Sequence, residues 1–138
     1  MDTMLLVEAV REAKRVYLIG NGGSYANAVH LCNDLLSCGI KAYTLDPASL
    51  SASANDYGYE TVFARWLSVV GEEGDLLIAL SGSGKSPNIL NAVEEARAIG
   101  MNVYPIFGNE RGEDMQDAEE AQLMIGHQVR LCLQQTIS

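Results

Sequence analysis

The sequence has 138 residues, of which 48% are hydrophobic and 20% charged, which is enough apolar material for one domain with one core. Its 18 acidic and 9 basic residues give a formal net charge of −9, and such a surface repels nucleic-acid phosphates and anionic lipid heads. Direct binding to nucleic acid or to a membrane is therefore disfavoured, whereas a small anion held by local N–H donors is compatible with this charge.

The start of the sequence and its cysteines carry no mark of secretion. No basic stretch followed by an apolar run and a cleavage site opens the sequence, and no apolar stretch approaches the roughly 20 residues that span a bilayer. Cys32, Cys38 and Cys132 are odd in number and lack metal-ribbon spacing, so they are predicted to be buried free thiols. A cytoplasmic location is expected.

Short apolar runs alternate with helical patterns along the chain. Strands are predicted over 16–19, 41–45, 76–80 and 102–107, and helices over 2–14, 25–37, 60–70, 87–99 and 118–135. Residues 46–59 are expected to be irregular, and 108–117 to form a polar connection too short to hold a strand. The alternation predicts one α/β domain over 1–138: a three-layer, doubly wound parallel sheet of about four strands in the order 2-1-3-4.

Two Ser/Gly loops each join a predicted strand to a predicted helix. They run from Asn21 to Ser24 and from Ser81 to Ser86, and Ser86-Pro87 is a favourable N-cap and first helical residue. Helix N-termini offer unpaired N–H groups and a partial positive charge, and the carboxyl ends of parallel strands are where ligands bind in such folds. The two loops together predict a phosphate site.

Two nucleotide-binding motifs are excluded. Gly20-Asn21-Gly22 is followed by Tyr25 where the dinucleotide fingerprint needs its third glycine. Gly84-Lys85-Ser86 resembles the end of a P-loop, but Ala79 stands where the first glycine should be. No nucleotide cofactor is expected.

Four stretches resemble sugar isomerase (SIS) domains, and among them the phosphoheptose isomerases. They are GNGGSYANAVHL (20–31), ANDYGYETVFARW (54–66), GDLLIALSGSGKSPNILNAVEEARAIGMNV (74–103) and AQLMIGH (121–127). The resemblance implies a homo-oligomer, a dimer or tetramer, whose active site is shared between subunits. It also implies that the sugar is contacted by Asn21 and Asp56, and that the phosphate is held by the loop residues Gly22, Gly23, Ser24, Ser81, Gly82, Ser83 and Ser86.

Some members of this family carry zinc, and the resemblance implies the ligands His30, Asp34, Glu119 and His127. On a helix, His30 and Asp34 share one face about 6 Å apart along the axis, a spacing at which they can share a metal or a proton. Glu119 and His127 are about 12 Å apart if both are helical, which is long for two ligands of one ion.

The inferred reaction is aldose–ketose isomerisation through a cis-enediol, with Asp34 as base and His127 as partner acid/base. The resemblance implies sedoheptulose 7-phosphate as substrate and D-glycero-D-manno-heptose 7-phosphate as product. An isomerase for a smaller phosphorylated sugar is a second hypothesis. A third is a non-catalytic SIS domain that senses a sugar phosphate or binds another protein, as replication-initiator-binding relatives do.

The sequence departs from the family pattern in several places. Asp34 stands where the family has Glu, Glu119 where it has Gln, and Cys38 where an Arg is common. A fifth strand and a first long helix are also missing. The phosphate loops are complete, so we expect phosphate binding to tolerate these departures better than catalysis.

Overall fold

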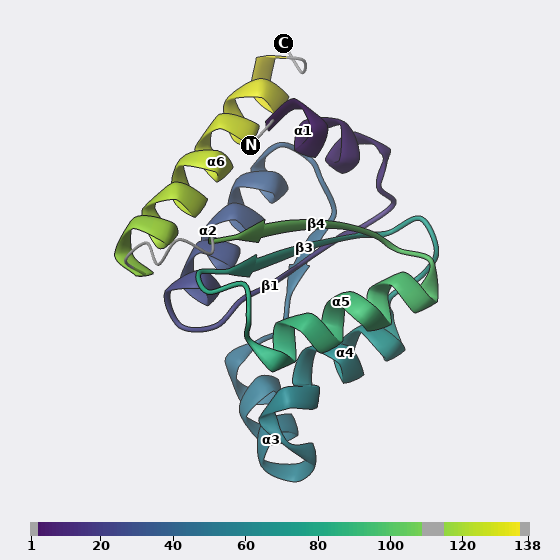
Figure 1. The fold of residues 1–138 in the computed structure, drawn as a ribbon. Coiled ribbons are helices and arrows are strands. Elements are labelled where there is room, and N and C mark those ends of the chain that lie inside the picture. The colour runs from purple at the N-terminus through teal and green to yellow at the C-terminus, as the bar shows by residue number, and fades with distance from the viewer. Residues whose placement is uncertain (1–2, 109–114, 136–138) are drawn as a thin grey trace.

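The computed structural model describes residues 3–108 and 115–135, which form a four-stranded parallel sheet covered by helices (Figure 1). The strands are β1 (Val16–Ile19), β2 (Ala42–Thr44), β3 (Leu76–Ser81) and β4 (Asn102–Phe107). Their order is β2-β1-β3-β4, and Val16 pairs with both Ala42 and Leu76. The predicted fold class, strand number and strand order are therefore confirmed.

Six α-helices and one 3-10 turn connect and cover these strands in the described part of the chain. They are α1 (Thr3–Glu12), α2 (Gly23–Ser37), α3 (Pro47–Tyr57), η1 (Tyr59–Thr61), α4 (Val62–Val70), α5 (Pro87–Ile99) and α6 (Met115–Gln135). None of these helices is both long and apolar enough to cross a membrane.

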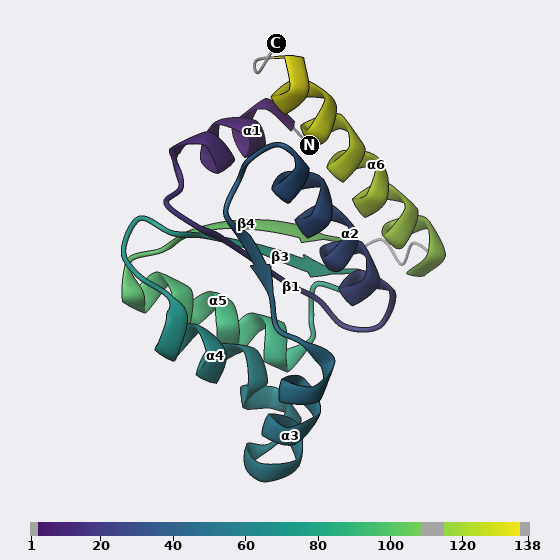
Figure 2. The same ribbon diagram turned by 180° about the vertical axis from the view of Figure 1, so that it is seen from behind.

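The sheet separates two apolar cores. Helices α1, α2 and α6 cover one face, and α4 and α5 cover the other (Figures 1 and 2). All four residues of β1 and all six of β3 are buried, because a strand in the middle of a parallel sheet is covered on both faces. These two central strands end at the loops that the sequence singled out.

Residues 46–59 are mostly helical, so the prediction of an irregular segment is wrong. Asp46 caps α3 by accepting a hydrogen bond from the backbone N–H of Ser49 at 2.9 Å, and Pro47 takes the first helical position. Gly58 ends the helix at φ 95°. Helix α3 has no buried residue, so it lacks the apolar stripe on which the prediction relied, although its capping signals are present in the sequence.

Helices α2 and α6 both begin earlier than predicted, at Gly23 and Met115. The sequence predicted that 108–117 contains no strand. Most of this segment, residues 109–114, lies outside the described residues. Gly108 follows β4, and Met115 opens α6.

Strand β4 forms one edge of the described sheet. Asn102 and Gly108 donate backbone hydrogen bonds to the carbonyls of Asp75 and Ser81, so the backbone N–H groups of the even-numbered residues of β4 point toward β3. The backbone nitrogen of Pro105 therefore points toward the open edge, where its missing N–H costs no hydrogen bond of the sheet.

Candidate functional site

The first loop delivers Ser24 to the end of the sheet within the first turn of α2. The chain turns at Gly22, whose φ is 53°, and the N–H of Ser24 bonds the carbonyl of Asn21 at 2.9 Å. Ser24 is buried, with 2% of its surface exposed. Its Oγ accepts a hydrogen bond from Gln122 of α6 at 3.1 Å.

The second loop folds over its own serines. Ser81 is the last residue of β3 rather than a loop residue, and its Oγ accepts from the N–H of Gly84 at 3.0 Å. The Oγ of Ser83 accepts from the N–H of Lys85 at 3.1 Å. The two Oγ atoms are 3.5 Å apart, so one hydroxyl can donate to the other, which leaves the hydrogen of the second for an anion. Ser86 is the N-cap residue of α5 as predicted, without using its side chain as the cap.

An amide pair joins the two loops. The Nδ2 of Asn21 donates to Oδ1 of Asn88 at 2.9 Å, and the Nδ2 of Asn88 donates back at 2.8 Å. Tyr59 also donates to the Oδ1 of Asn21, at 2.8 Å. Sequence reasoning missed Asn88 and Tyr59, since nothing local indicates that α5 and η1 meet the first loop.

Two small cavities open where the loops meet. One of about 40 Å³ is lined by residues of both loops and the start of α6: Asn21, Ser24, Leu80, Ser81, Gly82, Ser83, Ser86 and Met115. This space exceeds the roughly 10–15 Å³ that one water needs, so it can admit a small polar group. Beside it lies a cavity of about 230 Å³ lined by Gly20, Asn21, Gly22, Tyr25, Pro47, Leu50 and Tyr59. Asn21 belongs to both cavities.

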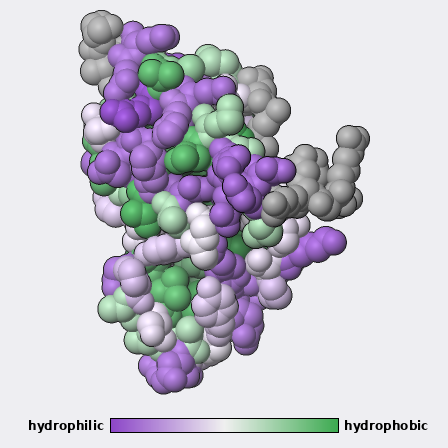
Figure 3. Space-filling model, turned by 90° about the vertical axis from the view of Figure 1, so that its left-hand side faces the viewer, coloured by the Kyte–Doolittle hydropathy of each residue, from purple (hydrophilic) through white to green (hydrophobic). Residues whose placement is uncertain are grey.

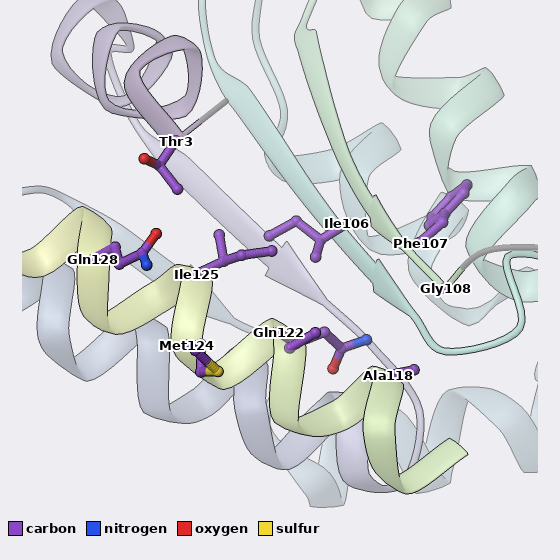
Figure 4. Close-up of a pocket in the computed structure, with 10 residues that line it drawn as sticks. Thr3, Ile106, Phe107, Gly108, Ala118, Gln122, Met124, Ile125 and Gln128 are labelled. Atoms are coloured by element: carbon purple, nitrogen blue, oxygen red, sulfur yellow. The ribbon is translucent and has the colours of Figure 1, made fainter. Parts of the chain in front are cut away.

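The face of the molecule toward which the strand ends point is mostly hydrophilic, with apolar residues in small separate groups (Figures 1 and 3). Such a surface suits a polar ligand. Asp56, predicted to contact the sugar, is exposed on α3 and does not line either small cavity. A larger cavity of about 450 Å³ between α6 and β4 is lined by none of the predicted site residues (Figure 4).

Helices α2 and α6 bring both histidines together. The Nε2 atoms of His30 and His127 are 3.2 Å apart, and His30 Nε2 is 3.5 Å from Oδ2 of Asp34. Asp34 is 3% exposed, whereas both histidines are exposed. Arg130, which sequence reasoning missed, places Nη1 3.4 Å from Oδ1 of Asp34. The predicted convergence of His30, Asp34 and His127 is therefore present in the structure.

The three side chains form a group that could hold a metal ion. Zinc bound tetrahedrally at about 2.0–2.2 Å from N and O ligands keeps the ligand atoms about 3.3 Å apart. One candidate ligand atom from each of His30, Asp34 and His127 lies within 4.8 Å of the others. Oδ2 of Asp34 is buried and accepts no hydrogen bond from the described residues, so it is an oxygen with an unused coordinating position. Three protein ligands with one open position are typical of catalytic zinc.

Glu119 is not part of this group. Its carboxylate lies directly against Gly23 at the start of α2, where a Cβ would overlap it. Glu119 and His127 are eight positions apart and both lie in α6, so the helix itself separates the two side chains. Cys38 is buried just after α2. Burial also raises the pKa of the Cys32 thiol, which lies six residues earlier in the chain.

Fold and site together define a class of protein. A family model described as the SIS domain matches residues 3–108, and the chain belongs to the SIS-domain family. Within that family its relatives include phosphoheptose isomerases. The one from Burkholderia pseudomallei is 38% identical over 143 residues, covering 88% of this chain and 73% of the relative. The one from Nitratiruptor is 35% identical over 147 residues, covering 91% and 79%.

The fold comparison agrees. The structure of a phosphoheptose isomerase from Francisella tularensis superposes with a TM-score of 0.87 at 27% identity, covering 96% of this chain and 84% of that one. The recognition made from the four sequence stretches is therefore confirmed.

Proposed function

We propose that this chain is a phosphosugar isomerase that interconverts sedoheptulose 7-phosphate and D-glycero-D-manno-heptose 7-phosphate. The observation that carries the proposal is the coexistence of two sites on α2: the serine-lined cavity at its N-terminus and the His30–Asp34–His127 group farther along the helix. Ser24 and His30 are six residues apart, about 9 Å along the axis. This spacing lets a linear sugar phosphate reach from one site to the other.

The phosphate would be bound by hydroxyls and by helix N-termini. Ser81 and Ser83 accept hydrogen bonds from backbone N–H groups of their own loop, and their two hydroxyls, 3.5 Å apart, would offer a hydrogen to the phosphate oxygens. The start of α2 supplies a partial positive charge at the same cavity. These local donors offset a net charge of −9, which would otherwise disfavour a dianion.

The proton transfer is assigned to Asp34 and His127, at the end of the proposed site away from the phosphate cavity. One group removes the proton from the carbon beside the carbonyl, and a second moves a proton between the two oxygens of the enediol. Oδ2 of Asp34 is suited to be the base because it accepts no hydrogen bond from the part of the chain that the structure describes, while Arg130 lies beside Oδ1. His127 is exposed and suited to exchange protons with the oxygens.

His30, Asp34 and His127 would hold a zinc ion. A bound zinc ion polarises the oxygens of a carbonyl or diol as a Lewis acid. The same Oδ2 of Asp34 cannot coordinate a metal and take a proton at once, so the two roles of Asp34 are alternatives. A zinc titration of the activity separates them: activation supports the ligand role, and inhibition supports the base role.

The direct test is an assay of the purified protein with sedoheptulose 7-phosphate, with and without zinc, beside His127→Ala and Ser81→Ala. We expect turnover by the natural chain, its loss in His127→Ala with phosphate binding retained, and weakened phosphate binding in Ser81→Ala. No turnover in any condition, together with thermal stabilisation by the sugar phosphate, would rule out the enzyme. It would leave the second candidate, a sugar-phosphate sensor, which the two Ser/Gly loops support together with Asp34 and Glu119, where the family pattern has Glu and Gln.

We also propose that the chain forms a homo-oligomer, a dimer or tetramer. Leu5 of α1 and Met124 and Leu131 of α6 are 58%, 62% and 58% exposed, and exposed apolar side chains of this size would be covered by contact with another copy. Light scattering during size-exclusion chromatography tests this. A monomer at micromolar concentration would contradict it.

A further inference from the structure

Gln122 is a buried polar side chain that the proposed chemistry leaves unused. It lies in the middle of α6, is 3% exposed, and its amide projects toward the strand ends (Figure 4). Burying an amide is costly unless its hydrogen bonds are made. The amide of Gln122 makes two hydrogen bonds, one with Asn27 and one with Ser24, both in α2.

One backbone carbonyl fixes the direction of these bonds. The carbonyl of Glu119 can only accept, and it lies 2.8 Å from the side-chain nitrogen of Asn27. That nitrogen is thus the donor, and its second hydrogen goes to Oε1 of Gln122 at 3.0 Å. The Nε2 of Gln122 is left to donate to Oγ of Ser24 at 3.1 Å.

The end of this chain is the phosphate cavity. Ser24 lines the cavity, and its oxygen already accepts from Gln122. Its single hydroxyl hydrogen is therefore the group that remains for a ligand. We propose that Gln122 is a positioning residue of the phosphate site, which makes Ser24 a donor toward an oxyanion in the cavity. The oxygens of Ser81 and Ser83 likewise accept hydrogen bonds, in their case from backbone N–H groups of their own loop.

The inference rests on the proposed phosphate site but not on isomerase activity. Its test is therefore binding of inorganic phosphate, measured by calorimetry in EDTA so that no metal takes part. The variants are Ser24→Ala, Gln122→Met and the double substitution. Gln128→Met is the matched control, because Gln128 is exposed on the same helix.

Ser24→Ala removes a hydrogen bond to a charged ligand and is expected to weaken phosphate binding about tenfold. Gln122→Met should weaken it several-fold, and the double variant should bind no worse than Ser24→Ala, because Gln122 acts through Ser24. Gln128→Met should bind like the natural chain. The near-isosteric Gln122→Glu offers only acceptors, turns the Ser24 hydrogen away from the cavity, and should cost at least as much as Ser24→Ala.

Two results would overturn the positioning role while leaving the phosphate site intact. One is a double variant whose loss of phosphate affinity equals the product of the two single losses. The other is phosphate affinity equal to that of the natural chain in both Gln122 variants. Failure of the natural chain itself to bind phosphate would overturn the proposed function along with it. Far-UV circular dichroism and thermal unfolding of each variant show whether a loss of binding comes from a loss of folding.

Discussion

Arg130 is paired with Asp34, the buried carboxylate of the His30–Asp34–His127 group, which makes Arg130→Leu an informative substitution. Its Nη1 lies 3.4 Å from Oδ1 of Asp34, a carboxyl group whose side chain is only 4% exposed. Leucine keeps the helix propensity and most of the apolar stem. The substitution therefore removes chiefly the charge that faces Asp34.

The size of the effect follows from distance and exposure. Two unit charges at 3.4 Å attract by about 5 kcal/mol at an effective dielectric constant of about 20, before any desolvation is subtracted. The side chain of Arg130 is 43% exposed, so water screens part of this. Breaking a fully buried pair costs about 3–5 kcal/mol, and an exposed pair is worth about 0.2–1 kcal/mol. We expect Arg130→Leu to lower the free energy of unfolding by about 1–2 kcal/mol.

Zinc should reduce this loss. A metal ion bound at His30, Asp34 and His127 would itself neutralise the carboxylate. In EDTA the full loss is expected in urea unfolding, and with excess zinc the loss should fall below about 1 kcal/mol. The variant should accordingly bind zinc more tightly than the natural chain, because the repelling guanidinium is gone.

Arg97→Leu is the control, because Arg97 is exposed on α5, on the other side of the sheet. It should change stability by less than about 0.5 kcal/mol with or without zinc. An equally small loss for Arg130→Leu would refute the charge pairing. A loss of about 1–2 kcal/mol that zinc leaves unchanged would refute metal binding beside Asp34.

Three further outcomes are expected. Gly20→Ala should destabilise the fold and abolish phosphate binding, since its Cβ would lie 2.6 Å from the backbone carbonyl of Ser24; retained binding would show that the loop adapts. Met115→Ala should widen the phosphate cavity that Met115 lines and weaken phosphate binding a few-fold by admitting water, as calorimetry can show. Iodoacetamide at neutral pH should modify Cys132, which is partly exposed, before Cys32, because burial raises the pKa of the Cys32 thiol and lowers its thiolate fraction. Peptide mass spectrometry gives the order of modification, and the reverse order would contradict this prediction.

The alternation of short apolar runs with helical patterns was sufficient to predict the sheet. Strands β1 and β3 are buried on both faces, so their entire sequences are apolar until the final Ser81, and no partner information is needed to recognise them. The phosphate loops were equally visible, because glycines, serines and Pro87 act locally at the ends of strands and helices. Helix α3 was missed because none of its residues is fully buried, although Asp46 and Pro47 mark its start.

The histidine group was reached from the sequence only through the family resemblance, because His30 and His127 are 97 residues apart. The packing of α2 against α6 decides that their nitrogens meet and that Glu119 points elsewhere, toward Gly23.

The sequence by itself determined which segments become strands and predicted an anion site at the ends of two of them, since these inferences depend on local backbone preference and burial. The tertiary structure alone decided which polar side chains meet across helices: Asn88 with Asn21, Arg130 with Asp34, and Gln122 with Ser24. Such contacts depend on the relative placement of whole elements, which is set by the packing of two apolar cores and leaves no local trace in the residues concerned.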